Sequence, residues 1–358
     1  MSAVATAPTG LTLSDRTGPG AAPVMSLAPG VLAAVGIAVV ATVAGGHLPV
    51  IGAPVLAILM GLAVSAIVPT RPSLRPGLRF TGKYVLQGSI VVLGLGLSLR
   101  QVVSIGVGSL PVLIGTLLSA LTMAWLAGKA LGLRRDVTTL IGVGTAICGA
   151  SAIAATDAVI EADEADVSYA VTTIFLFNVV AVIAYPLLGH LAGLSQHAFG
   201  LLAGTAVNDT SSVVATTSGY GHQAATYGLV VKLTRTLAII PVCIGLAAWR
   251  RGRVARPGTG PDAVPAEGPA WRGVLPLFLL GFLAAVVVNS VGLVPASLHA
   301  SLSRGATFMI TVALAAVGLS SGLGQIRKAG FRPIFLGAIL WATVGLSSLG
   351  LQAATGTL

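Results

Sequence analysis

Long stretches of apolar residues, separated by short polar or charged segments, follow one another along most of the chain. Many of them reach 18 residues, the length that a helix needs to cross the hydrocarbon core of a bilayer. The short alternating strands of a membrane β-barrel are not seen. The pattern therefore predicts an all-α polytopic membrane protein.

We predict eleven transmembrane helices from this pattern, and the third is short, separated from the fourth only at Arg100. They lie at residues 27–44, 50–68, 84–99, 102–127, 138–160, 167–188, 199–217, 224–248, 274–294, 306–323 and 333–351. Residues 1–26, rich in Ala, Thr, Pro, Gly and Ser, are expected to form a disordered cytoplasmic tail. Residues 27–358 then form one transmembrane domain, with a cytoplasmic linker at 249–272.

The 20 Lys and Arg residues test the count of helices. With eleven spans, only Arg100 and Arg304 fall on the side away from the N-terminus, and Lys232 and Arg235 lie inside the eighth span. The other 16 fall on the N-terminal side: Arg16, Arg71, Arg75, Arg79, Lys83, Lys129, Arg134, Arg135, Arg250, Arg251, Arg253, Arg256, Arg272, Arg327, Lys328 and Arg332. Because basic residues are enriched in cytoplasmic loops, the N-terminus is predicted to be cytoplasmic.

Composition supports a membrane protein. Charged residues make up 8% of the chain and the mean hydropathy is +0.96, whereas soluble domains have about 25% charged residues. The net charge of +10 is explained by topology and contact with anionic lipid, so nucleic-acid binding is not expected. The acidic loop at 161–166 is predicted to face outward. The two cysteines, Cys148 and Cys243, lie in separate apolar runs and predict neither a disulfide nor a metal site.

Two pairs of segments resemble each other. GTAICGASAIAAT at 144–156 aligns without gaps to GTAVNDTSSVVAT at 204–216, with six of thirteen positions identical. Residues 94–106 resemble residues 318–330. The third and tenth predicted helices run in opposite directions, as in inverted-repeat transporters, but the fifth and seventh run in the same direction. Small residues also recur wherever membrane helices pack closely, so both explanations stay open.

Polar side chains within the predicted spans gather in the fifth to eighth helices. A charge at mid-bilayer costs about 2.5–3.5 kcal/mol, so it faces a partner or a cavity. Lys232 and Arg235 share one helix face, and the simplest arrangement pairs one of them with Asp209. The candidate coupling residues are Asp209 and Asp157. The candidate substrate-binding residues are Thr145, Cys148, Ser151, Asn178, Asn208, Thr210, Ser211, Ser212, Lys232 and Arg235.

A surplus positive charge beside Ser and Thr hydroxyls predicts a site for an anion. The small residues at 144–151 would allow a broken helix there, which would offer free backbone N–H groups. A structural ion pair of Asp209, an interhelical hydrogen bond of Asn178 and a solvated Asp157 are the alternatives. Four histidines at span ends are expected to be loop residues: His190, His197, His222 and His299. The motifs H-E-x-x-H, G-x-S-x-G and the Walker loop are absent from the sequence.

Four stretches resemble the YeiH-type sulfate exporter family: GLRFTGKYVLQGSIVVLGLGLSL, GTAICGASAIAA, FGLLAGTAVNDTSSVVAT and VVKLTRTLAIIPV. The match runs from about Gly30 to the C-terminus, with Asn208-Asp209 where many members have His-Glu. The resemblance implies a secondary transporter distantly related to bile-acid symporters and cation–proton antiporters. Such proteins have a panel domain and a core domain with two crossing, broken helices. The fifth predicted helix would be one of these, and the glycine-rich end of the tenth is a candidate for the other.

The resemblance implies sulfate or small organic sulfonates as cargo. We therefore expect a secondary active transporter of a small anion in the bacterial inner membrane, an exporter that works by alternating access. Its mid-membrane site would lie between the fifth, seventh, eighth and tenth helices. The alternative is a sodium–proton or other cation–proton antiporter in which Asp209 and Asp157 bind the cation. No enzymatic activity and no cofactor other than a coupling H⁺ or Na⁺ are expected, and a homodimer is compatible with either function.

Overall fold

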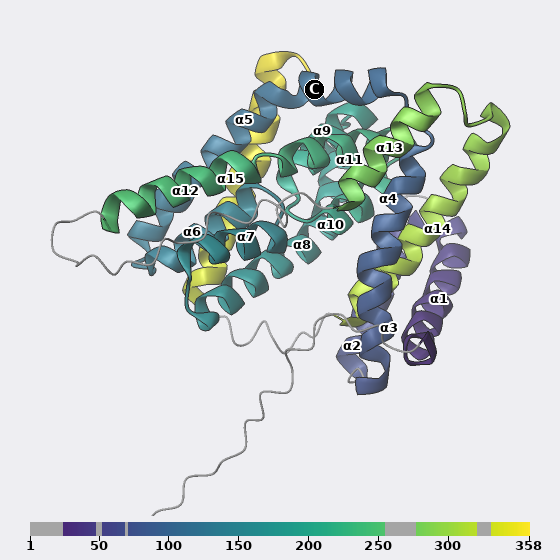
Figure 1. Ribbon diagram of the computed structural model, residues 1–358, viewed down its shortest axis with the longest axis horizontal. Helices are drawn as coiled ribbons and strands as arrows, with labels where there is room; N and C mark the ends of the chain where they lie inside the picture. The colour runs from purple at the N-terminus through teal and green to yellow at the C-terminus, as the bar shows by residue number, and fades with distance from the viewer. Residues whose placement is uncertain (1–23, 48–51, 69–70, 255–276, 321–330) are drawn as a thin grey trace, which may run out of the picture.

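The computed structural model describes residues 24–47, 52–68, 71–254, 277–320 and 331–358. The described residues form helices and no strand (Figure 1). The predicted tail lies outside this part up to residue 23, and the first residues of the predicted linker extend a helix to Val254. The helices are α1 (Val24–His47), α2 (Gly52–Ile67), η1 (Pro72–Leu74), α3 (Arg75–Phe80), η2 (Thr81–Val85), α4 (Leu86–Gly94), α5 (Leu99–Ala130), α6 (Arg135–Ala146), α7 (Ala150–Ile160), α8 (Glu164–Leu191), α9 (Gln196–Ala206), α10 (Thr210–Ser218), α11 (His222–Thr236), α12 (Ile239–Val254), α13 (Leu277–Ser290), α14 (Ala296–Ser320) and α15 (Phe331–Thr355).

Each predicted span overlaps one helix or consecutive helices. Six helical stretches in the described part are long and apolar enough to cross a membrane, namely those of α1, α5, α8, α11 with the start of α12, α14 and α15. The predicted fifth and seventh spans differ, because each is divided into two short helices. α6 and α7 have 12 and 11 residues, and α9 and α10 have 11 and 9. A helix needs about 20 residues to cross, so none of these four crosses alone.

The helices α6 and α7 form a re-entrant hairpin, which we call hairpin 1. Arg134, which precedes α6, forms ion pairs of 2.5 Å with Asp163 and 3.1 Å with Asp166, which follow α7. The start of α6 and the end of α7 therefore lie at the same end of the molecule. The two helices also pack closely, since a Cβ atom on Gly144 would lie 3.0 Å from the Ile153 side chain.

The helices α9 and α10 form hairpin 2 in the same way. Tyr220, which follows α10, donates a hydrogen bond of 2.6 Å to the carbonyl of Leu194, which precedes α9. Its ring stacks on Phe199 with the centroids 3.7 Å apart. Gln196 Oε1 accepts a hydrogen bond from the N–H of Gln223 at 3.1 Å. The chain therefore enters and leaves hairpin 2 at one end as well.

The long helix α8 places the two hairpins at opposite ends. Hairpin 1 opens beside the first turn of α8, at what we call the Arg134 end (residues 131–134 and 161–163). Hairpin 2 opens beside the last turn of α8, at what we call the His222 end (residues 192–195 and 219–222). Their tips approach each other halfway along α8, where Asn178 contacts residues 208 and 209 of hairpin 2 and Ile174 lies beside Gly149 of hairpin 1.

The eleven-span topology is therefore wrong at the fifth and seventh spans. Each of these segments returns to the end from which it came, because the chain reverses at the break instead of continuing. Losing two crossings leaves every basic loop on the side predicted for it. The acidic loop at 161–166 changes side: it was predicted to face outward, yet it pairs with Arg134 at the basic end.

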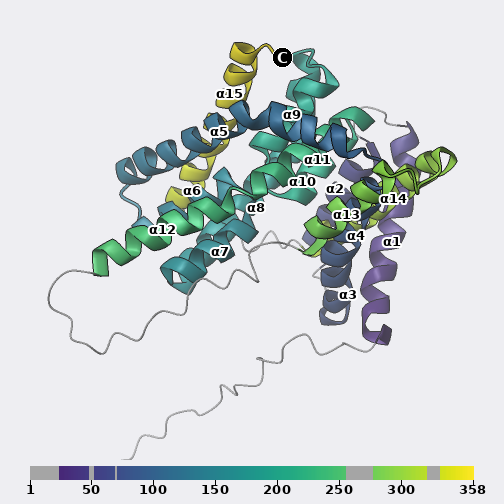
Figure 2. The same cartoon turned by 45° about the horizontal axis from the view of Figure 1, so that its top comes forward.

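The helices form two bundles, which the views in Figures 1 and 2 both separate. The panel bundle consists of α1 to α4, α13 and α14, and the core bundle consists of α5 to α12 and α15. The bundles meet where α10 packs against α2 and α14. Close approach is possible there because Gly52 of α2 lies against Gly219 at the end of α10.

Small residues allow helices within each bundle to pack closely, as in other membrane proteins. A Cβ atom on Gly61 of α2 would lie 2.7 Å from the carbonyl oxygen of Ala315 in α14. In the core bundle, a Cβ atom on Gly204 would lie 2.8 Å from the carbonyl oxygen of Gly228. Substitution at either glycine would push α2 from α14, or α9 from α11.

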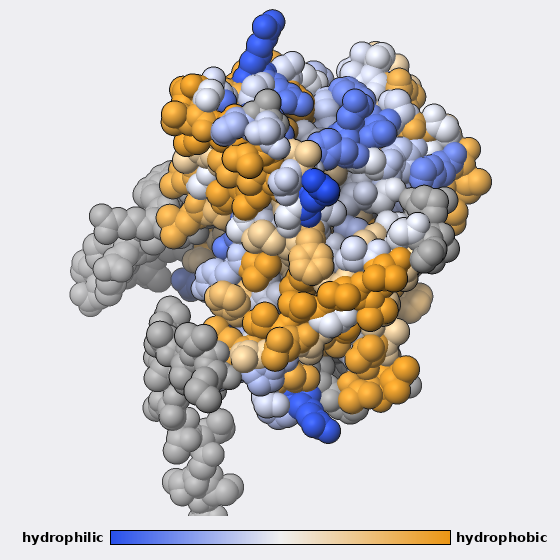
Figure 3. Space-filling model, turned by 90° about the vertical axis from the view of Figure 1, so that its right-hand side faces the viewer, coloured by the Kyte–Doolittle hydropathy of each residue, from blue (hydrophilic) through white to orange (hydrophobic). Residues whose placement is uncertain are grey.

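The outside of the molecule is largely apolar. On the face seen in Figure 3, hydrophobic side chains cover much of the middle and lower part, and many hydrophilic residues gather towards the top. Large apolar side chains on both bundles are exposed, among them Leu32 of α1, Leu280 of α13 and Val107, Ile114 and Trp125 of α5. Such a surface is suited to lipid, so the protein is a multi-pass membrane protein.

Candidate functional site

The two similar segments of the sequence form the tips of the two hairpins. α6 ends at Ala146 and α7 begins at Ala150, while α9 ends at Ala206 and α10 begins at Thr210. In the gapless alignment of the segments these boundaries fall at the same positions. The break predicted from the small residues at 144–151 is confirmed. The second break lies in the seventh predicted span, whereas the glycine-rich segment proposed from the tenth, 321–330, lies outside the described residues.

Lys232 and Arg235 bind the backbone at both breaks. Lys232 Nζ donates hydrogen bonds to the carbonyl of Ile147 at 2.7 Å and to the carbonyl of Val207 at 2.9 Å. The Arg235 guanidinium donates to the carbonyls of Ala146 at 2.6 Å and Thr145 at 2.7 Å, and also to the carbonyl of Thr205. One turn of α11 thus ties the two tips together.

These carbonyls are the ones that a helix end leaves without partners. The last C=O groups of a helix have no intrahelical N–H donor, and together they carry about half a negative charge. At the C-terminal end of α6, the carbonyls of residues 145 and 146 and of the following residue 147 are all bound by the two cations. Lys232 and Arg235 are almost completely buried, so the helix ends and the cations compensate each other away from water.

Asp209 does not form the ion pair predicted for it. Within the described part of the chain Asp209 has no cationic partner, whereas Arg134 pairs with Asp163 and Asp166 at the other end of hairpin 1. Asp209 is instead the N-cap of α10: its Oδ2 accepts hydrogen bonds from the N–H of Ser212 at 3.2 Å and from the hydroxyls of Ser211 and Ser212. The carboxylate therefore occupies the positive N-terminal end of α10, while the cations occupy the opposite helix ends.

Asn178 holds hairpin 2 from the side. Its Oδ1 accepts hydrogen bonds from the N–H groups of Asn208 at 3.2 Å and Asp209 at 3.3 Å. The interhelical hydrogen bond considered for Asn178 is thus present. Asn178 also lines the cavity described next, so its structural contact does not prevent contact with a ligand.

A cavity of about 120 Å³ lies where the N-terminal ends of α7 and α10 meet the panel bundle. Its polar lining comes from the core bundle and consists of Asn178, Asp209, Ser211 and Ser212. The rest of the lining is Ile58 of α2, Ala150 of α7, Val171, Ile174, Phe175 and Val179 of α8, and Val317 of α14. The cavity therefore lies on the surface that the two bundles share.

The other residues predicted to bind the substrate, including Lys232 and Arg235, do not line this cavity. Thr145 is buried and contributes its carbonyl to Arg235. Cys148 and Asn208 are buried in the breaks, and the Asn208 side-chain oxygen has no hydrogen-bond partner. Ser151 and Thr210 belong to the first turns of α7 and α10, where Ser151 is exposed and Thr210 partly exposed.

Asp157, the second candidate coupling residue, lies apart from the hairpin tips. Its Oδ1 accepts a hydrogen bond of 3.1 Å from the N–H of Ala162, at the Arg134 end of hairpin 1. It lines neither of the described cavities. The geometry therefore does not bring Asp157 and Asp209 to one cavity.

Sequence reasoning missed the apolar part of the lining and the backbone acceptors. Phe175 is three residues before Asn178 and so lies on the same face of α8, a signal that could have been used. Ile58 and Val317 come from the panel bundle and carried no signal, because they look like any other apolar residue of a membrane helix. The carbonyls that bind Lys232 and Arg235 belong to residues whose side chains are irrelevant to the contact.

Comparison with known proteins finds relatives along most of the chain. Residues 29–337 match the family model described as conserved hypothetical protein 698. A UPF0324 membrane protein of Streptococcus pyogenes serotype M6 is 42% identical over 307 residues, which cover 84% of this chain and 89% of the relative. UPF0324 membrane proteins of Streptococcus mutans and Fusobacterium nucleatum are 39% and 34% identical, again over 84% of this chain, and 89% and 90% of their own lengths are covered.

Proposed function

The chain belongs to the UPF0324 membrane protein family, the YeiH-type family that its motifs resemble, and on this basis we propose that it is a secondary active transporter of a small anion. The anion is sulfate or an organic sulfonate, and it binds in the cavity between the hairpin tips and the panel bundle. Transport is export, from the Arg134 end to the His222 end, across the bacterial inner membrane.

The observation that supports an anion is the orientation of the four helix ends at the tips. The C-terminal ends of α6 and α9 face Lys232 and Arg235. The N-terminal ends of α7 and α10 reach the cavity through Ala150 and Ser211. Free backbone N–H groups at a helix start, together with serine hydroxyls, bind anions in many proteins.

Asp209 provides the coupling in this proposal. Its carboxylate accepts the hydrogen bonds of Ser211 and Ser212 that an incoming anion would need. Two anions at one helix end repel each other, so the anion binds when Asp209 is protonated or has moved away. Protonation of Asp209 is thereby linked to anion binding, and H⁺ is the coupling ion.

Alternating access uses the two bundles. The cavity has walls from both bundles, because Ile58 and Val317 belong to the panel bundle and the polar residues to the core bundle. A displacement of the core bundle along the panel bundle would open the tips to one end and then to the other. Hairpin 1 would then separate the cavity from the Arg134 end, and hairpin 2 would separate it from the His222 end.

Flux measurements on the reconstituted protein test this function. Proteoliposomes are expected to move labelled sulfate, and the variant Ser211→Ala/Ser212→Ala is expected to raise the KM for the anion about tenfold to a hundredfold, since a hydrogen bond to a charged group contributes about 1.5–3 kcal/mol. Thr307→Ala, exposed on α14, is the matched control. Full sulfate flux in the double serine variant would contradict the site.

The pH dependence of the same flux tests the coupling role of Asp209. Because the anion needs the protonated carboxyl, flux is expected to rise as the pH on the loading side falls. Asp209→Asn keeps a neutral N-cap residue and is expected to transport with little dependence on pH. A pH profile identical to that of the unaltered protein would exclude Asp209 as the proton carrier.

The alternative is a cation–proton antiporter, which the carboxylate of Asp209 in the cavity favours. The position of Asp157 outside this cavity disfavours it, because a bound cation would have only one carboxylate ligand there. Labelled sodium in the same proteoliposomes separates the two functions. Sodium uptake that depends on Asp209, without sulfate flux, would replace the anion transporter by the antiporter.

The proposal includes neither an enzymatic reaction nor a prosthetic group. No group of three metal-ligating side chains is found among the described residues. The partners we propose are the small anion and the lipid bilayer, with no role for nucleic acid. A homodimer is compatible with the proposed mechanism and is not required by it.

A further inference from the structure

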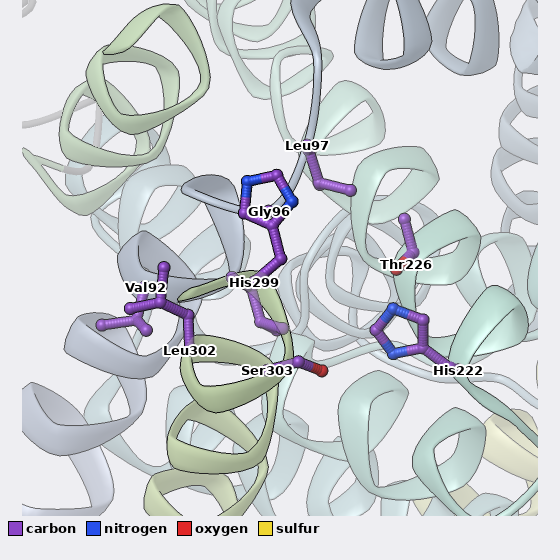
Figure 4. A pocket seen from close by; sticks show the side chains of 9 residues that line it. Val92, Gly96, Leu97, His222, Thr226, His299, Leu302 and Ser303 are labelled. Carbon is purple, nitrogen blue, oxygen red and sulfur yellow. The ribbon is translucent and has the colours of Figure 1, made fainter. Parts of the chain in front are cut away.

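A second cavity, of about 70 Å³, lies between the two bundles at the His222 end (Figure 4). The core bundle contributes His222 and Thr226 of α11, and the panel bundle contributes His299 and Ser303 of α14. In Figure 4 the ring of His222 lies across the gap from Ser303, beside Thr226. The rest of the lining is apolar or glycine: Val92, Leu93, Gly96, Leu97 and Leu302.

The hydrogen bonds of His299 fix the role of one ring nitrogen. Asn289 Nδ2 donates a hydrogen bond of 3.0 Å to the carbonyl of Leu97, which leaves Asn289 Oδ1 as an acceptor. His299 Nε2 lies 3.0 Å from this Oδ1 and is therefore the donor. The free nitrogen, Nδ1, is a hydrogen-bond donor only when the ring is protonated. His299 is thus held in one orientation by contacts outside the cavity.

The surroundings of this cavity favour negative charge. Six of the seven acidic residues in the described part of the chain lie at the Arg134 end, and the seventh is Asp209 at the hairpin tips. The six are Asp136, Asp157, Glu161, Asp163, Glu164 and Asp166. The loops at the His222 end, within the described residues, carry no carboxylate, while Arg100 and Arg304 lie in the helices beside them.

The lining chemistry disfavours other classes of ligand. Protein sites for hard cations are built largely from carboxylates, and no carboxylate lines this cavity. A transition metal needs three or four good ligands, and the lining offers two imidazoles. Two imidazoles that can carry charge, with the hydroxyls of Thr226 and Ser303, are suited to a small oxyanion.

We propose that His222, Thr226, His299 and Ser303 form a second binding site for a small tetrahedral oxyanion, on the path between the hairpin-tip cavity and the His222 end. This site rests on the proposed function for its role in transport, since an anion that leaves the tip cavity towards this end passes between the same two bundles. His222 and His299 are the titratable residues in the lining, so binding tightens when the imidazoles are protonated.

Nuclear magnetic resonance of the imidazoles tests the site. The chain has five histidines, so the full-length protein labelled with nitrogen-15 in histidine gives few signals to assign. Titration with sodium sulfate in mildly acidic buffer is expected to shift the signals of His222 and His299 in a saturable way. Sodium chloride at equal ionic strength is expected to shift them little. In the variant Thr226→Val/Ser303→Ala, the sulfate concentration that gives half of the full shift is expected to rise about tenfold.

Two variants separate this site from the tip cavity and from unfolding. Asp209→Asn is expected to leave the histidine shifts intact. His299→Gln retains a donor for Asn289, so it is expected to fold and to lose the sulfate response of His222. His190→Gln is the control, because His190 lies at the same end and stacks on Tyr220 outside the cavity.

The inference is overturned if sulfate shifts neither His222 nor His299 beyond the chloride control, or if the Thr226→Val/Ser303→Ala variant responds like the unaltered protein. If the unaltered protein shows the saturable histidine shifts but carries no sulfate flux, the result counts against the proposed function alone. Normal flux without histidine shifts would remove only the second site.

Discussion

Lys232 and Arg235 show how far a single residue can be interpreted from the sequence. Two cations inside an apolar helix predicted a functional centre, and both lie at the meeting point of the two hairpins. Their partners could not be predicted, because the acceptors are main-chain carbonyls, which every residue possesses. Asn178, Asp209, Ser211 and Ser212 were predicted from their polarity and do line one cavity. Their role in binding stays a prediction.

At this scale we predict that Lys232→Met destabilises the protein. Methionine fills the space and leaves the carbonyls of Ile147 and Val207 unpaired. Each buried unpaired group costs about 1–3 kcal/mol, so the loss is about 2–6 kcal/mol. Unfolding in detergent, followed by tryptophan fluorescence, measures it. Lys83→Met, at an exposed position, is the control. If both variants have the same free energy of unfolding, Lys232 does not hold the tips together.

The hairpins are the elements that the sequence only partly predicted. The small residues at 144–151 predicted a break, and the similar segment at 204–216 is broken at the aligned position. Hydropathy could not reveal the reversal of direction, because two short apolar helices on either side of a break have the same pattern as one long helix. The ion pairs of Arg134 with Asp163 and Asp166 join residues 29 to 32 positions apart, which a pattern along the chain does not predict.

The two topologies differ in the sides of two loops, and labelling of single cysteines distinguishes them. With Cys148 and Cys243, both buried, replaced by alanine, we expect Ala162→Cys to react with a membrane-impermeant maleimide only from the cytoplasmic side. Gly193→Cys is expected to react only from outside. Eleven crossings would give the reverse for both positions. Leu133→Cys, next to Arg134, serves as the cytoplasmic reference.

On the scale of the whole molecule, the sequence predicted the class of protein and the positions of its helices. The grouping of these helices into two bundles was implied only by the family resemblance. Contacts such as Gly61 with Gly318 and Gly204 with Gly228 connect parts of the chain that are distant or separated by another helix, and no local pattern says which glycines meet. Both described cavities lie between the bundles, which is why relative motion of the bundles is central to the proposed mechanism.

Cross-linking tests that motion. In the protein without native cysteines, Thr226→Cys and Leu302→Cys lie on opposite sides of the second cavity, one on each bundle. A short, reducible bifunctional reagent is expected to abolish sulfate flux, and reduction is expected to restore it. The pair Val91→Cys and Gly281→Cys joins two helices of the panel bundle and is expected to tolerate the reagent. Full flux after complete cross-linking of the first pair would show that the bundles need not move.

The central claim is that the anion binds where the N-terminal ends of α7 and α10 open to the cavity. Diffraction from crystals grown with selenate, a sulfate analogue whose selenium scatters anomalously, tests this most directly. We predict an anomalous peak between Ala150, Asn178 and Ser212 that disappears in the Ser211→Ala/Ser212→Ala variant. Under conditions in which selenate competes with sulfate for transport, an empty cavity with selenate bound elsewhere would contradict the account.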